Sequence, residues 1–118
     1  MTTDLEQIRN AISDITGRPS YIALMKDDFD SVTPEGMVHV CGDSADEVLE
    51  ALAGEYAKLQ AELSGVLLFV RSGILTMNDL GRITKGVPHC PFYKAGLSFD
   101  KPEGRAVEVF VFYSRKAG

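Results

Sequence analysis

The chain has 118 residues, 45% of them hydrophobic and 25% charged, which fits one globular domain and excludes a disordered chain. Residues 1–64 carry thirteen acidic and four basic side chains, whereas residues 65–118 carry four acidic and eight basic ones. The net charge of −5 argues against general nucleic-acid binding, and the longest apolar runs are too short to span a membrane.

The first half of the chain contains two amphipathic helical patterns. Apolar residues recur every three or four positions over 5–15 and over 48–63, and a capping box at Thr3 and another at Ser44 precede them. Gly54 lies inside the second pattern, where glycine disfavours a helix, and close approach to another backbone would account for it.

Two short apolar runs between these helices predict strands over 21–25 and 37–41. The acidic segment 27–30 between the strands is predicted to be a polar loop, because Pro34 and Gly36 follow as a turn signal. Alternation along the second strand places His39 and Cys41 on one of its faces.

The second half begins with a buried strand over 66–70 and a further strand over 74–77. A short helix is then expected from Asn78 to Gly86. Two final strands, over 93–99 and 105–115, are separated by five residues with the composition of a hairpin loop.

This order of elements predicts a single α+β domain over residues 1–118. We expect a mostly antiparallel sheet of about five strands, with the two main helices packed on one face and a long C-terminal β-hairpin at the end. In that hairpin, alternation groups Ala95 and Leu97 with Val107, Val109 and Val111 on the covered face. Lys94 and Glu108 lie on the other face, where we expect a diagonal pair.

The cysteines and histidines form two pairs that suggest two alternative kinds of site. Two His and two Cys residues are a ligand set for structural zinc, although the spacing is not the usual one. A cysteine enzyme or redox sensor would instead use Cys90 as nucleophile, with His89 or His39 as its base and nearby cations lowering the thiol pKa. The four candidate zinc ligands are His39, Cys41, His89 and Cys90.

A basic segment over residues 71–94 suggests an anion site, because it holds four cations and Asp79 is its one acidic residue. Its ligand would be a small anion or an acidic protein surface. The candidate ligand-binding residues are Arg71, Arg82, Lys85, Lys94 and His89.

Phe110 and Phe112 share the less covered face of the last strand, so we expect them to contact a partner unless another segment folds over them. That strand could also pair with a second copy of the chain, and the charge split between the two halves favours self-association. The N-terminus lacks the pattern of a secretory leader, and the two cysteines do not form a disulfide framework, so a cytoplasmic location is expected.

The sequence therefore predicts a non-catalytic binding module that forms homo-oligomers and needs no cofactor. It would recognise an anionic ligand or a protein through segment 71–94 and the two phenylalanines. The cysteine enzyme and the structural zinc domain remain the alternatives.

Overall fold

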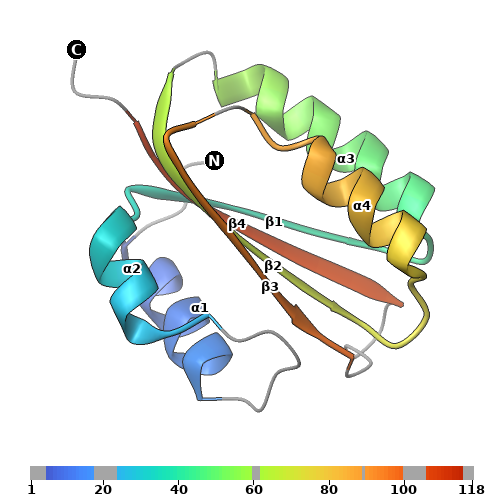
Figure 1. The fold of residues 1–118 in the computed structure, drawn as a ribbon, viewed down its shortest axis with the longest axis horizontal. Coiled ribbons are helices and arrows are strands. Elements are labelled where there is room, and N and C mark those ends of the chain that lie inside the picture. The colour runs from blue at the N-terminus through green and yellow to red at the C-terminus, as the bar shows by residue number, and fades with distance from the viewer. Residues whose placement is uncertain (1–4, 18–23, 60–61, 89, 100–105, 116–118) are drawn as a thin grey trace.

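The computed structural model describes residues 5–17, 24–59, 62–88, 90–99 and 106–115. Those residues form four helices and four strands (Figure 1). None of the helices combines the length and the apolar composition needed to cross a lipid bilayer. In chain order the elements are α1 (Leu5–Thr16), α2 (Lys26–Val32), β1 (Gly36–Gly42), α3 (Ala45–Leu59), β2 (Leu63–Ser72), α4 (Met77–Lys85), β3 (Phe92–Ser98) and β4 (Val107–Arg115).

The four strands form one mixed sheet in the order β1-β4-β2-β3. β4 runs antiparallel to both of its neighbours, whereas β2 and β3 are parallel and are connected through α4. The predicted α+β domain is confirmed, but the prediction of about five mostly antiparallel strands is wrong. The predicted C-terminal hairpin is not found, because β2 lies between β3 and β4.

The position of β4 follows from its side chains, which are apolar on both faces. Val109 and Val111 point to one side of the sheet and Phe112 to the other, and all three are buried. Such a strand is more stable inside a sheet than at its edge. The predicted grouping of Ala95 and Leu97 with the β4 valines is correct, since alternation along each strand fixes the face but not the neighbouring strand.

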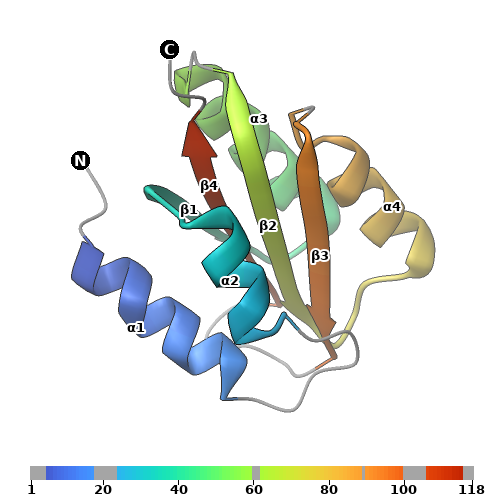
Figure 2. The same ribbon diagram turned by 60° about the vertical axis from the view of Figure 1, so that its left-hand side comes forward.

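Helices cover both faces of the sheet, which corrects the prediction of two main helices on one face. α1 and α2 pack on one side, and α3 and α4 pack on the other (Figures 1 and 2). Phe29 of α2 meets Phe112 edge to face, with ring centroids 5.1 Å apart. We call the two sides the α1/α2 face and the α3/α4 face.

Two local predictions fail, one because tertiary packing outweighs a polar sequence and the other because a helix cap ends the predicted strand. The predicted acidic loop is helix α2, whose first turn is closed by a 2.8 Å hydrogen bond from the Met25 N–H to Asp28, and whose Phe29 is buried. The predicted strand over 74–77 is irregular up to Thr76, which caps α4 through the Asp79 N–H at 3.1 Å. The predicted strand over 21–25 falls mostly outside the described residues, and Leu24 and Met25 are not in a strand.

Candidate functional site

Four polar side chains meet on the α1/α2 face where β1 and β2 end and β4 begins. Cys41 pairs with Glu108 across β1 and β4, and Glu108 pairs with Arg71 across β4 and β2. His39 lies two residues before Cys41 on the same face of β1, as the sequence predicts. We call His39, Cys41, Arg71 and Glu108 the His39 cluster. The carboxyl ends of parallel strands are where open α/β sheets commonly bind ligands.

The potential ligand atoms of this cluster converge on one point. The His39 Nε2 lies 2.9 Å from a Glu108 carboxylate oxygen and 3.6 Å from the Cys41 Sγ. One ligand atom from each of these three residues lies within 4.8 Å of the other two. His39 and Cys41 are exposed, so the point is open to solvent.

Glu108 is held as a carboxylate at neutral pH. The hydrogen bond with His39 lowers the pKa of Glu108; burial and the charge of Asp14 oppose this effect, and the charges of His39 and Arg71 add to it. Arg71 Nη1 lies 3.7 Å from the second carboxylate oxygen, and the Arg71 side chain is largely buried. Within the described residues, the buried Arg71 Nε has no hydrogen-bond partner. The carboxylate is therefore fixed from both sides by the sheet.

This geometry favours metal ligation over nucleophilic catalysis. In a nucleophile–His–carboxylate triad, one imidazole nitrogen faces the nucleophile and the other faces the carboxylate. Here Cys41 and Glu108 both approach the same atom, His39 Nε2. Three groups that converge on one point are arranged as a candidate ligand set rather than as a proton relay.

The predicted set of four zinc ligands is not brought together. Cys90 is buried in the α3/α4 core just before β3, and β3 and β1 are opposite edges of the sheet, about 14 Å apart. His89 lies outside the described residues. His39 and Cys41 therefore lie apart from Cys90 and have Glu108 as their neighbour.

Within the part of the chain that the structure describes, Cys90 also lacks the surroundings of a nucleophile. Burial raises the pKa of its thiol, although hydrogen bonds with the backbone of Val66 and Phe92 partly oppose that effect. The thiol donates to the Phe92 carbonyl at 3.0 Å. The predicted lowering of this pKa by nearby cations is wrong.

The four predicted anion-binding cations are distributed over both faces of the sheet. Arg71 contacts Glu108, and Lys94 donates to Asp28 of α2 at 2.8 Å, both on the α1/α2 face. Arg82 lies on α4 on the opposite face and pairs with Asp46 of α3 at 2.6 Å. Lys85, on the last turn of α4, is exposed and has no ion-pair partner within the described residues. The predicted Lys94–Glu108 pair does not form.

The two phenylalanines predicted to contact a partner lie beneath α1 and α2. Phe112 is 0% exposed, and Phe110 is partly buried in the same cluster. Phe112 cannot contact a partner while the domain is folded. β4 is an interior strand, so it cannot pair with a second copy as predicted.

Sequence reasoning missed Glu108 as a member of the site, because the hairpin prediction placed it beside Lys94. The β1–β4 pairing that joins it to His39 spans 69 residues of sequence. The last strand is apolar on both faces apart from one acid, and this lone acid is the signal that could have identified the site. No known protein family matches the chain, and no curated protein with a similar sequence was found.

Proposed function

We propose that the protein binds a zinc ion through His39, Cys41 and Glu108. The convergence of an imidazole nitrogen, a thiol sulfur and a carboxylate oxygen carries this proposal. Zinc prefers these three ligand types. Standard zinc bond lengths in a tetrahedron separate nitrogen and sulfur by about 3.6 Å. The distance from His39 Nε2 to Cys41 Sγ is also 3.6 Å.

Three protein ligands leave one position of a tetrahedral ion open, which is the pattern of zinc sites that bind a further ligand rather than only stabilise a fold. The exposed position of the site supports a water molecule or a small anion as that fourth ligand. The guanidinium of Arg71 adds positive charge next to Glu108 and favours an anion there. An anion is therefore best accommodated as the fourth ligand of the proposed metal ion. Arg71 is the one predicted anion-binding cation that belongs to this site.

A cysteine ligand requires a reduced thiol, and neither Cys41 nor Cys90 forms a disulfide within the described residues. We propose a cytoplasmic location on this ground, because thiols stay reduced there.

To test this proposal, the full-length chain is treated with a chelator, the chelator is removed, and cobalt binding is then measured. Cobalt occupies zinc sites, and a thiolate ligand gives a charge-transfer band in the near ultraviolet. We expect one ion per chain, the thiolate band in the wild-type protein, and displacement of cobalt by zinc.

Cys41→Ser removes the proposed sulfur ligand and should abolish the band. Cys90→Ser is the matched control, since a serine hydroxyl can still donate to the Phe92 carbonyl and the residue is far from the site. Absence of the band in the wild-type protein, or its loss in the Cys90→Ser variant alone, would show that the proposed site is wrong.

A further inference from the structure

The proposed metal site has one sulfur ligand, and that sulfur lies on an exposed side chain. Cys41 is one residue from the end of the edge strand β1, and Cys41 and His39 are both exposed. Zinc binds cysteine as the thiolate, which is also the form that oxidants attack. With three protein ligands, a tetrahedral ion keeps one position open. A small oxidant therefore has access to the Cys41 Sγ while the ion is bound.

The other cysteine of the chain is too far away to form a disulfide with Cys41. Through the strand register, Cys41 shares one row across the sheet with three residues, Glu108, Arg71 and Ser98. Ser98 ends β3, whereas Cys90 precedes the start of that strand, about 20 Å from the row along the strand direction. A disulfide requires Cα atoms within about 7 Å of each other. Because the chain has two cysteines, an oxidised Cys41 has no partner thiol in its own chain.

The two cysteines also differ in how readily an oxidant reaches them. Cys90 is 9% exposed, and its thiol donates to the Phe92 carbonyl at 3.0 Å. Burial raises the pKa of that thiol, which keeps it protonated and slow to react. Cys41 is exposed, and its Sγ lies 3.6 Å from His39 Nε2. Oxidation is therefore expected at Cys41, and not at the cysteine that the sequence suggests for a redox sensor.

We infer that hydrogen peroxide oxidises Cys41 and thereby releases the zinc ion. This inference rests on the proposed zinc site. The thiolate sulfur attacks one peroxide oxygen, an S–O bond forms and the O–O bond breaks. The other oxygen leaves as hydroxide and takes the proton of the new sulfenic acid, so the products are a sulfenate and water. His39 and Glu108 are then the unmodified members of the ligand set, and two ligands hold the ion less tightly than three.

A small thiol such as glutathione should restore the site. Since Cys90 cannot reach Cys41, the sulfenic acid condenses with the external thiol, which releases water and forms a mixed disulfide. A second thiol molecule then attacks this disulfide, the Cys41 thiolate leaves, and the small thiol is recovered as its own disulfide. Zinc can then bind again.

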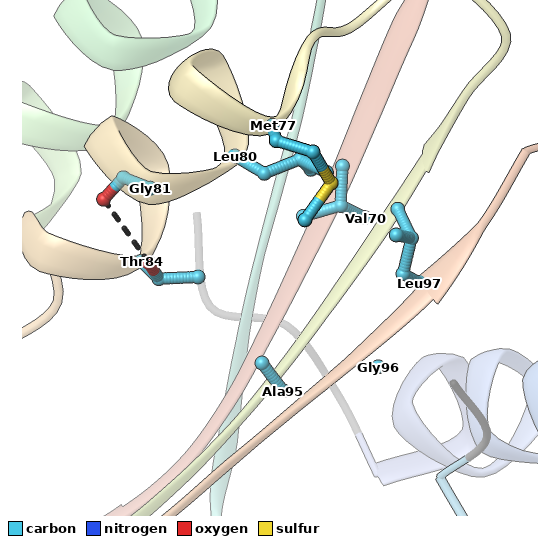
Figure 3. Close-up of a pocket in the computed structure, with 8 residues that line it drawn as sticks. All are labelled: Val70, Met77, Leu80, Gly81, Thr84, Ala95, Gly96 and Leu97. Carbon is cyan, nitrogen blue, oxygen red and sulfur yellow. Dashed lines mark hydrogen bonds between the residues drawn. The ribbon is translucent and has the colours of Figure 1, made fainter. Parts of the chain in front are cut away.

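Methionine thioethers are the other sulfur groups that peroxide oxidises. Met25 and Met77 are 59% and 74% exposed. Met77 of α4 lines a pocket between this helix and β3 on the α3/α4 face, opposite the metal site (Figure 3). Neither methionine belongs to the proposed ligand set, so oxidation of either should leave the zinc in place.

The test uses the full-length, zinc-loaded protein, hydrogen peroxide and a chromogenic chelator that reports released zinc. A separate sample contains dimedone, which labels sulfenic acids, and mass spectrometry locates the label. We expect the loss of one zinc ion per chain in step with labelling of Cys41, and renewed zinc binding after glutathione is added. Two control variants should release zinc at the wild-type rate: Cys90→Ser, and Met25→Leu combined with Met77→Leu.

The possible failures are distinguishable. If the untreated protein holds no zinc, the proposed site is wrong and this inference falls with it. If zinc binds but stays bound while Cys41 is oxidised, or if Cys41 resists peroxide, the site stands and the inference is overturned. Release of zinc without modification of Cys41, or release that either control variant abolishes, would also overturn it.

Discussion

The rings of His39 and Phe110 stack across the β1–β4 pair, with centroids 4.3 Å apart and planes 7° apart. Phe110 in turn lies parallel to Phe112, which is fully buried. An exposed imidazole is thereby placed on a support that is continuous with the core. Metal sites gain affinity when their ligands are held in position before the ion arrives.

Replacing Phe110 by leucine should weaken metal binding while the fold is kept. Loss of the stacked ring frees the His39 imidazole to rotate away from Cys41 and Glu108. Groups that orient a ligand are commonly worth about tenfold or more in metal affinity. Cobalt titration of Phe110→Leu measures this, with Phe92→Leu on the opposite edge of the sheet as the control. Equal affinities would contradict a supporting role for Phe110.

Arg71 should act on the site through Glu108. Its positive charge is one of the causes that lower the pKa of Glu108. Arg71→Met should therefore raise the pKa of Glu108, and Arg71→Lys should raise it less, because the charge is retained but its position is less fixed. An NMR titration of the Glu108 carboxyl carbon measures the change. An unchanged pKa in Arg71→Met would mean that the 3.7 Å contact has no electrostatic effect.

The lowered pKa of Glu108 predicts how its contribution to stability depends on pH. A carboxyl whose pKa is lower in the folded state contributes stability above its usual pKa of 4.5, and this contribution is lost as the pH falls through the lowered value. At neutral pH, Glu108→Gln should have a smaller free energy of unfolding than the wild-type protein. The difference should shrink below pH 4.5.

Urea denaturation at several pH values tests this dependence. Glu55→Gln is the control, since the Glu55–Lys58 pair is an exposed ion pair expected to contribute less than about 1 kcal/mol. A difference between wild type and Glu108→Gln that stays constant through acid pH would contradict the expected role of the carboxylate.

The local elements could be predicted because their signals are local. Helical spacing identified α1 and α3, and strict alternation placed His39 and Cys41 on one face of β1. Strand neighbours could not be predicted in this way. A five-residue turn sequence after Phe99 favoured a hairpin between the last two strands. However, β2 is apolar on both faces, and its burial is most complete when it lies between β3 and β4.

Part of the candidate site could be predicted because its sequence signal is also local. His39 and Cys41 are two residues apart on one strand, so their shared direction is a local property. Glu108 joins them only through the β1–β4 register. The zinc hypothesis therefore included one pair that the structure brings together with Glu108, whereas Cys90 of the other pair lies near the far edge of the sheet.

Two glycines in different surroundings should respond to alanine with opposite signs. Gly36 begins β1 opposite Tyr113, and the Tyr113 ring occupies the space that a Cβ at position 36 would need. Gly54 lies within α3, and among the described residues a Cβ there would meet nothing within 4 Å. Close approach to another backbone, suggested by the sequence, therefore does not explain Gly54.

Gly36→Ala should lower the free energy of unfolding by about 1–3 kcal/mol, because the aromatic ring must move within a packed region. Gly54→Ala should raise it by about 0.5–1 kcal/mol, since alanine favours a helix over glycine and creates no clash here. Urea denaturation of the two variants beside the wild-type protein measures both changes. If Gly36→Ala is as stable as the wild type, the Tyr113 ring is not held against β1. If Gly54→Ala is destabilised, α3 has a neighbour at position 54 that this arrangement does not include.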